Sequence, residues 1–393
     1  MTRTWEFEWV DDWSTIWSEP FLKQWRELLD SAPDPHVFFE PALAKAWLEV
    51  FNEIQDMSPR FLLATDREGR RALFPLVSVR SRWKDMWRRA ISPVGQPGFD
   101  YRDPIFSSAL DAHTWACFWT EFDDELARRW RGTFDIAAIY QLRAADWMSW
   151  PVVKTSHAIV APGPDDVAPR IQLSGFNTFE DYLATRHPRF RRNVQYGIRR
   201  LRDRGELTYR VFSGLDVDCV LADLQALLQV NRRRWPMTWR AKGYYESLVR
   251  HGMPNGLVHY SRLELDGEPI SWHLGFNYRG ALLWYLPTFR DEFRAFSPGR
   301  MHIALAIENS IRERLPILDF TIGGEPYKYE WSNTTVQLYA FNVFGTGPLS
   351  KMRNMWSSRG KRYLVRARRV LSVRLNARLA QRSAVSGLAG GPS

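Results

Sequence analysis

The residues best suited to bind a phosphorylated ligand lie within residues 284–300, WYLPTFRDEFRAFSPGR, directly before a stretch with helical apolar periodicity. Ser297 suits the N-cap of that helix and Pro298 its first turn, so free amides and the positive end of the helix dipole would face outward. Helix ends of this kind bind phosphate groups. Gly299 would let a diphosphate approach the backbone, and two side chains could add charge-assisted hydrogen bonds, Arg294 and Arg300. The alternative is that Ser-Pro-Gly only marks a helix start.

The composition places this chemistry in a globular protein. A length of 393 residues favours two domains at roughly 100–200 residues each, and 45% hydrophobic with 25% charged residues is typical of a packed chain. Cys117 and Cys219 are the only cysteines, so we expect no disulfide framework, no zinc site and a reducing compartment. The acidic N-terminal stretch is unlike a secretory signal, and no run of about 18–20 apolar residues could span a membrane. We expect a cytoplasmic protein.

The net charge of +10 comes from the C-terminal end of the chain. Residues 351–393 hold eleven basic residues and no acid, which leaves 43 basic and 44 acidic residues in the first 350. Residues 363–375 place apolar and basic side chains at helical spacing, a pattern that suits an anionic membrane surface. A solvated helix packed on the body is equally consistent with the pattern. The nearly neutral body argues against nucleic acid as a partner.

Apolar periodicity and turn residues predict mixed helices and strands in both halves. In the first half we expect three helices and three strands: helices at 19–29, 41–51 and 110–128, and strands at 61–65, 72–76 and 134–139. A linker is expected at 161–164. The second half is expected to hold helices at 179–186, 190–204, 217–235, 244–251 and 298–312, and strands at 207–212, 258–265, 270–278, 281–287, 317–322 and 336–343. The hairpins at 60–80 and 260–279 suggest an internal duplication.

The order and spacing of several motifs resemble the CelD-like family of GNAT acetyltransferases. That family is associated with cellulose and other exopolysaccharide synthesis and is related in fold to the Fem aminoacyl-transferases of peptidoglycan. The strongest elements of the resemblance lie in the second half: FRRNVQYGIRRL at 190–201 with Gly205, the hairpin at 265–270, the loop at 296–299, and LDFTIGGEPYK at 318–328. Weaker ones lie in the first half, at 37–39 with Trp47, 74–76, 92–95 and 101–104.

The resemblance implies a mixed α/β, α+β fold with two tandem GNAT domains, each a mostly antiparallel sheet flanked by helices. The expected boundaries are 1–165 for the first domain, 166–350 for the acetyltransferase domain and 351–393 for a basic helical tail. The loop at 296–300 would then hold the diphosphate of acetyl-CoA or another acyl-CoA, with no metal. GNAT enzymes often show a Gly-x-Gly or Gly-x-Ala loop here, whereas this chain has Gly299 alone, so another thioester or ester donor is the alternative.

The resemblance also implies where the acyl transfer takes place. The reaction needs a base for the nucleophile, a group that polarises the carbonyl and an acid for the leaving thiolate. We expect Glu325 to be the base and Tyr327 or Tyr285 the acid. Lys328 could bind an anionic part of the acceptor, and Asp319 could do the same or could close its strand through hydrogen bonds. His273, inside an apolar strand, is more readily explained as a core histidine.

A strongly basic stretch, residues 186–204, has Asp203 as its only acid. Its arginines occupy more than one helix face, so they cannot all contact one ligand. As an element typical of the family, Arg189 and Arg192 are expected to hold a sugar nucleotide or lipid-linked phosphate, because arginine matches phosphate geometry. A solvated basic face is the alternative.

Three functions follow. The first is an acyl-CoA-dependent transferase, moving groups other than aminoacyl groups, that acts on an amine or hydroxyl of a sugar or surface-polysaccharide precursor. The second is a Fem-like ligase that uses aminoacyl-tRNA, in which the basic stretch would hold RNA. The third is a non-catalytic component of an exopolysaccharide assembly. The near-neutral body favours the first.

Overall fold

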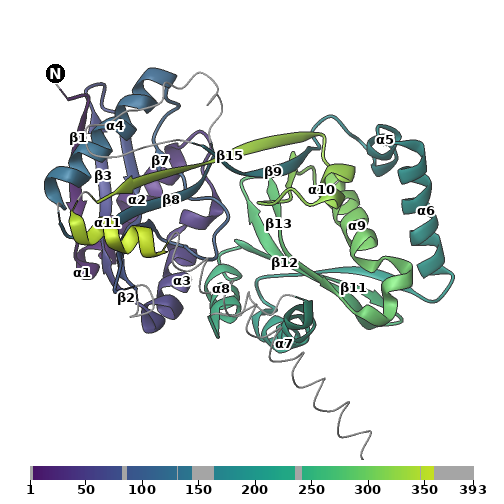
Figure 1. Ribbon diagram of the computed structural model, residues 1–393. Helices are drawn as coiled ribbons and strands as arrows, with labels where there is room; N and C mark the ends of the chain where they lie inside the picture. The colour runs from purple at the N-terminus through teal and green to yellow at the C-terminus, as the bar shows by residue number, and fades with distance from the viewer. Residues whose placement is uncertain are drawn as a thin grey trace, which may run out of the picture.

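The structure is a computed structural model, and it describes residues 3–81, 86–130, 132–143, 163–234, 241–345 and 347–357. We call residues 3–143 the first half and residues 163–345 the second half. Figure 1 shows the two halves side by side, with the strand β15 (Thr334–Phe344) running from the second half into the first. Helices and strands alternate in both halves, so the expected mixed α/β class is confirmed.

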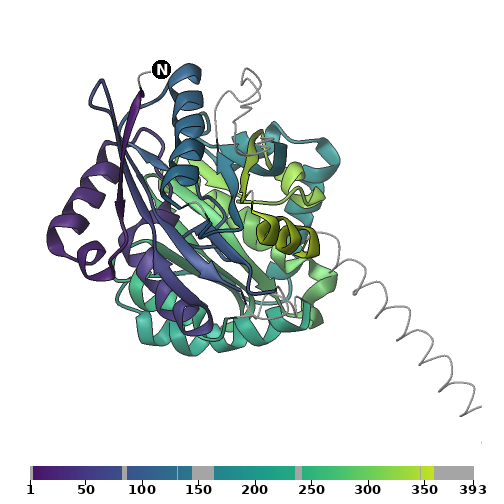
Figure 2. The same ribbon diagram turned by 60° about the vertical axis from the view of Figure 1, so that its left-hand side comes forward.

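The predicted helices and strands of the first half are all present, together with others that the sequence patterns did not predict. Its helices are α1 (Trp13–Ile16), α2 (Glu19–Ser31), η1 (Val37–Phe39), α3 (Pro41–Ile54) and α4 (Ala112–Arg129). Its strands are β1 (Trp5–Val10), β2 (Asp56–Pro59), β3 (Phe61–Asp66), β4 (Arg71–Phe74), β5 (Leu76–Arg80), β6 (Arg89–Pro93), β7 (Ile105–Phe106) and β8 (Ile136–Arg143). In Figure 2 the helices α1 and α2 (purple) and α4 (blue) lie on opposite sides of β1.

The second half contains the elements that position the site. Its helices are α5 (Phe179–Ala184), α6 (Pro188–Arg202), α7 (Val217–Arg234), α8 (Tyr244–Gly252), η5 (Asp291–Phe296), α9 (Pro298–Arg312) and α10 (Pro326–Trp331), and α11 (Pro348–Met355) follows. Its strands besides β15 are β9 (Gly163–Gln172), β10 (Leu207–Phe212), β11 (Val258–Leu265), β12 (Glu268–Tyr278), β13 (Ala281–Phe289) and β14 (Ile317–Asp319). Of the expected linker at 161–164, residues 161–162 lie outside the described residues and Gly163 begins β9.

One eleven-stranded sheet joins the halves, in the order β10-β11-β12-β13-β14-β9-β15-β8-β6-β5-β2, beside a four-stranded sheet β1-β3-β4-β7. Two of its neighbouring pairs are parallel, β13–β14 and β6–β8, and each pair is connected through a long helix, α9 or α4. The order β11-β12-β13-β14 in the second half thus corresponds to β2-β5-β6-β8 in the first. This correspondence agrees with the expected internal duplication.

The predicted boundaries at residues 165 and 350 fall inside β9 and α11. The reason is that β15 pairs with β9 on one side and with β8 on the other, so the strand belongs to the sheet of both halves. Helix α11 then packs on the first half, where Ser350 donates a hydrogen bond of 2.6 Å to the buried Asp135. The remainder of the predicted tail, residues 358–393, lies outside the described residues.

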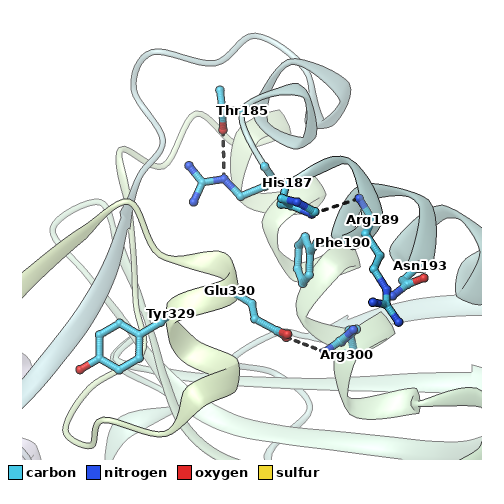
Figure 3. A pocket seen from close by; sticks show the side chains of 9 residues that line it. Thr185, His187, Arg189, Phe190, Asn193, Arg300, Tyr329 and Glu330 are labelled. Atoms are coloured by element: carbon cyan, nitrogen blue, oxygen red, sulfur yellow. Dashed lines mark hydrogen bonds and ion pairs between the residues drawn. The ribbon is translucent and has the colours of Figure 1, made fainter.

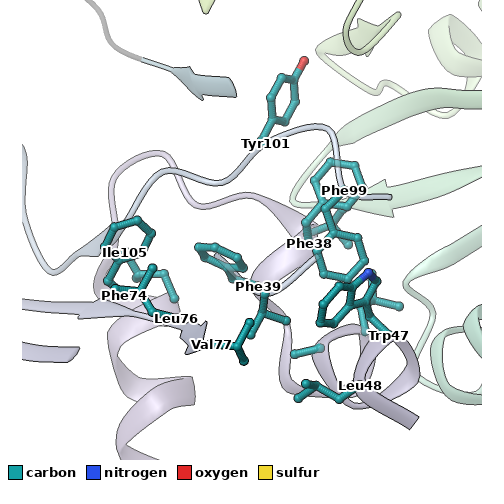
Figure 4. Close-up of a cluster of buried hydrophobic side chains, with 14 of the residues drawn as sticks. Phe38, Phe39, Trp47, Leu48, Phe74, Leu76, Val77, Phe99, Tyr101 and Ile105 are labelled. Carbon is teal, nitrogen blue, oxygen red and sulfur yellow. The ribbon is translucent and has the colours of Figure 1, made fainter. Parts of the chain in front are cut away.

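Aromatic side chains build much of the core. In the first half a cluster that includes Phe38, Trp47 and Phe99 is fully buried (Figure 4), and Phe38 also packs edge-on against Phe276 of β12 at 5.2 Å between ring centroids. The core therefore extends across the junction of the halves. Among the described residues, no helix is both long and apolar enough to cross a membrane.

Candidate functional site

The parallel strands β13 and β14 part in the middle of the sheet. They are paired only over three residues, from Ala281 opposite Ile317 to Leu283 opposite Asp319. Beyond this point β13 continues to Phe289, whereas the chain leaves β14. The gap is a cavity of about 530 Å³, which we call the central cavity, and its lining includes β13 residues 284–289 together with residues from α9 and α10.

A bulge shapes the strand that borders the gap. The register of β12 on β13 shifts between Leu274 and Phe276, and a side chain at Gly275 would lie 2.1 Å from the carbonyl oxygen of Leu283, so the close approach requires glycine. His273 fills the space beside the bulge. Its ring stacks on Trp284 at 3.8 Å, and its Nε2 accepts a hydrogen bond of 3.2 Å from the amide of Tyr285. The interpretation of His273 as a core residue is confirmed.

Six of the predicted site residues line the central cavity: Tyr285, Gly299, Arg300, Glu325, Tyr327 and Lys328. The last three are brought in by α10, a short helix that the sequence patterns did not predict. They were expected on and just after a strand at 317–322, but β14 ends at Asp319. Gly323, with φ of 112°, adopts the backbone conformation that favours glycine, and Pro326 begins the helix.

The predicted base and acids differ in how far they are buried. Glu325 is half exposed and lies 3.0 Å from the ammonium group of Lys328, which is buried and also donates to the carbonyl of Ile322. Burial raises the pKa of Tyr327 and that of Tyr285, so both phenols hold their protons at neutral pH. The Tyr285 hydroxyl donates to the carbonyl of Gly98, a first-half residue.

The start of α9 is where the sequence placed it, with Ser297 at the N-cap and Pro298 first in the helix. The Ser297 hydroxyl makes no capping hydrogen bond, however, and the residue has a positive φ of 52°. Because proline has no amide hydrogen, Gly299 supplies the first amide without a helical acceptor. A Cβ at Gly299 would lie 3.1 Å from the ring of Phe289, so packing alone favours glycine at this position.

Two predicted donor-site residues do not line the central cavity. Arg294 lies in η5 and forms an ion pair of 3.0 Å with Asp291, and Ser297 precedes the lining residues of α9. Arg300, by contrast, lines the cavity and pairs with Glu330 of α10. Of the two arginines that were predicted to bind a diphosphate, only Arg300 therefore lines the central cavity.

Asp319 is buried and is not among the residues that line the central cavity. Its carboxylate forms three interactions: with the Tyr101 hydroxyl at 2.8 Å, the Thr321 amide at 2.8 Å and Arg170 at 2.7 Å. These donors favour the alternative that Asp319 closes its strand through hydrogen bonds over a role in binding the acceptor. The bond to Tyr101 ties the second half to the first.

One carboxyl of the cavity was missed by the sequence analysis. Asp100 of the first half lines the central cavity and is only 8% exposed. Burial raises its pKa to about 7, although a hydrogen bond from Thr321 and the charges of Arg102 and Lys328 oppose the shift. A group that titrates near neutrality suits a general acid or base. The only sequence signal that could have indicated Asp100 was its position directly before the motif at 101–104, which resembles the family.

A second cavity, of about 680 Å³, lies at the junction of α5 and α6, and we call it the basic cavity (Figure 3). Nine residues line it: Thr185, Arg186, His187, Arg189, Phe190, Asn193, Arg300, Tyr329 and Glu330. Arg189 is among them, whereas Arg192 of the same helix lines neither cavity. Only one of the two arginines that were expected to act together therefore lines the basic cavity.

Comparison with known proteins identifies a region that contributes most of the residues lining these cavities. Residues 188–329 match the family described as acetyltransferase (GNAT) domain. This region has a GNAT-type acyltransferase fold. No curated protein matches the chain. Among solved structures, FemX is similar with a TM-score of 0.57 and 10% sequence identity, covering 84% of this chain and 98% of its own.

Two further solved structures are similar over most of the chain. A tandem GNAT protein from the clavulanic acid biosynthesis pathway has a TM-score of 0.44 and 11% identity, covering 88% of this chain and 99% of its own. The C-terminal domain of a putative lysylphosphatidylglycerol synthetase from Agrobacterium fabrum has a TM-score of 0.49 and 12% identity, covering 76% and 88%. At such identities a structural likeness concerns the fold alone, and the FemX likeness extends it across both halves.

Proposed function

We propose that the protein is an enzyme that transfers an acetyl or other acyl group from acyl-CoA to an amine or hydroxyl of a sugar or surface-polysaccharide precursor. The observation that carries the proposal is the parting of β13 and β14 into a cavity that ends at the N-terminus of α9. Beyond Leu283 the edge of β13 that faces β14 pairs with no strand of the described residues, so its backbone groups are suited to pair with the amides of a pantetheine arm.

The residues at the end of the cavity fit the phosphorylated part of such a donor. The amide of Gly299 and the positive end of α9 favour an anion, and Arg300 adds a guanidinium there. The donor would supply a thioester carbonyl for attack. A cavity of about 530 Å³ is within the range of small-molecule sites, roughly 300–1,000 Å³.

The protein's own side chains could manage the protons of the transfer. Asp100 or Glu325 would accept the proton of the attacking amine or hydroxyl, and the raised pKa of Asp100, about 7, suits a base near neutral pH. Tyr285 or Tyr327 would donate a proton to the leaving thiolate, since both phenols remain protonated. Lys328, 3.0 Å from Glu325, would orient that carboxylate or bind an anionic acceptor.

Calorimetric titration with acetyl-CoA tests the donor site. We expect the wild type to bind, and the cavity-lining variants Ile303→Trp and Leu286→Trp to lose binding because the larger side chain fills the gap. Glu308→Trp, at an exposed position on the same helix α9, is the matched control and should bind as the wild type does. Melting temperatures establish that each variant is folded. Absence of binding by the wild type, or equal binding by all variants, would contradict the proposal.

A Fem-like ligase that uses aminoacyl-tRNA is the second candidate, and the likeness to FemX across both halves favours considering it. Its distinguishing property is binding of tRNA that weakens steeply as salt rises. A protein that binds tRNA in this way but not acetyl-CoA would support the ligase. A protein that assembles with polysaccharide enzymes but binds neither donor would instead be a non-catalytic component.

We also propose that α11 and the basic residues after it contact the anionic inner surface of the cytoplasmic membrane. Leu349, Met352 and Met355 are each between 42% and 60% exposed on α11, while Ser350 anchors the helix to the first half. Apolar side chains followed by a basic segment suit such a surface. Sedimentation with phosphatidylglycerol vesicles, with and without residues 351–393, tests the contact. Equal binding by both forms would refute it.

A further inference from the structure

The basic cavity carries positive charge that no acid of the described chain balances. Arg186 is fixed by neutral acceptors, with its guanidinium donating to the carbonyls of Trp331 at 3.3 Å and Ser332 at 2.8 Å. Arg189 is exposed and, like Arg186, has no ion pair with any acid that the structure describes. The single acidic residue of the lining is Glu330, which is already paired with Arg300. Two guanidinium groups are therefore available to an anionic ligand.

The N-terminus of α6 adds to the attraction. His187 is the N-cap, and its Nδ1 accepts from the amide of Arg189 at 3.3 Å, which leaves the other ring nitrogen to point away from the helix end. No acidic residue lies in the first turn of this fifteen-residue helix, so its dipole is not offset by a side chain of its own. Figure 3 shows His187, Arg189 and Asn193 on one wall, facing Glu330 and Arg300 on the other. Cationic and hydrogen-bonding groups thus converge from three helices, α6, α9 and α10.

Arg300 connects this cavity to the donor site. Its side chain lines both the basic and the central cavity, where it lies 5.3 Å from the centre of the Phe190 ring. A ligand with its reactive end between β13 and β14 can therefore extend past Arg300 into the basic cavity. With about 680 Å³, that cavity has room for a nucleotide-sized group.

We propose that the basic cavity binds the phosphate-bearing end of a substrate whose reactive end lies in the central cavity. This proposal depends on the proposed acyl transfer only for the chemistry at the reactive end of that substrate, in the central cavity. Arginine guanidinium groups pair with phosphate oxygens through two parallel hydrogen bonds, and Phe190 with Tyr329 offers aromatic surface for an attached base or sugar. The phosphate could come from a coenzyme A donor or from a phosphorylated acceptor, and both present the same chemistry to Arg189.

Titration with pyrophosphate tests the cavity without any acyl donor. Calorimetry at physiological ionic strength should show binding by the wild type and a loss of about 10-fold or more in Arg189→Gln, as expected when a charge-assisted pair is removed. Arg192→Gln is the matched control, because Arg192 is equally exposed on the same helix but lines neither cavity. It should change the affinity by less than about 2-fold. No binding by the wild type, or an equal loss in both variants, overturns the proposal.

Titrations with coenzyme A, dephospho-coenzyme A and UDP then identify the source of the phosphate. A loss in Arg189→Gln for coenzyme A but not for dephospho-coenzyme A assigns the site to the 3′-phosphate of the donor, and a loss for both assigns it to the diphosphate. A loss for UDP alone assigns it to a phosphorylated acceptor. Independence of all three from Arg189 overturns the proposal. Failure of the proposed function would appear separately, as absence of acetyl-CoA binding while pyrophosphate still binds.

Discussion

Replacing Asp100 by asparagine should stabilise the protein at alkaline pH. The pKa of about 7 in the folded state lies about three pH units above the ordinary value of 3.8, and each unit corresponds to about 1.4 kcal/mol, so ionising Asp100 costs the fold on the order of 4 kcal/mol. Between these two pKa values the folded chain binds more protons than the unfolded chain, so stability falls as pH rises. Below about pH 4 both states are protonated and the cost vanishes.

Urea unfolding at pH 8 and at pH 4.5 measures this effect. We expect Asp100→Asn to raise the free energy of unfolding by roughly 2–4 kcal/mol at pH 8 and by about 1 kcal/mol or less at pH 4.5. Asp103→Asn is the control with the opposite sign. Burial alone would raise the pKa of Asp103, but Arg143 holds it below its ordinary value, so this variant should lose stability at pH 8. A gain in Asp100→Asn that is the same at both pH values would show that ionisation of Asp100 is not what destabilises the folded protein.

Three further predictions concern the scaffold and the cavity. Tyr101→Phe removes the buried donor to Asp319 and should lower the free energy of unfolding by about 1–3 kcal/mol in urea titrations. Trp119→Ala should cost about 3–5 kcal/mol by the same measurement, because the fully buried ring packs on Phe341 at 4.6 Å. Lys328→Met removes a charge that lowers the pKa of Asp100, so the pH at which the Asp100→Asn stabilisation is half complete should move upward; an unchanged pH would contradict the assignment of that charge.

Sequence patterns within a short segment predicted helix α9, which contributes Gly299 and Arg300 to the central cavity. The bounds of α9, 298–312, follow from a proline in the first turn and continuous apolar periodicity, and both are properties of neighbouring residues. The short helix α10 was not predicted, because six residues after Gly323 and Gly324 carry too little periodicity to distinguish a helical turn from a loop. Glu325, Tyr327 and Lys328 were nevertheless singled out by the resemblance to a known family.

The features that the sequence did not predict depend on contacts between residues that lie far apart in the chain. Asp100 lines the cavity beside Thr321, which lies more than two hundred positions later in the chain and hydrogen bonds to it. The pairing of β15 with both β8 and β9 merges the two expected domains into one sheet, and no property of residues 334–344 alone selects two partners. The partners of Asp319, Tyr101 and Arg170, likewise come from distant segments of the chain.

The proposed acyl-CoA site between β13 and β14 is tested most directly by a crystal structure of the protein with acetyl-CoA. We predict that the pantetheine arm lies along β13 residues 284–289, in the gap that opens after Leu283, with the diphosphate at the amide of Gly299 and beside Arg300. The thioester should then lie within reach of Asp100 and Tyr285. Acetyl-CoA bound outside the gap between β13 and β14, with these residues unchanged, would contradict the proposal that this gap is the acyl-CoA site.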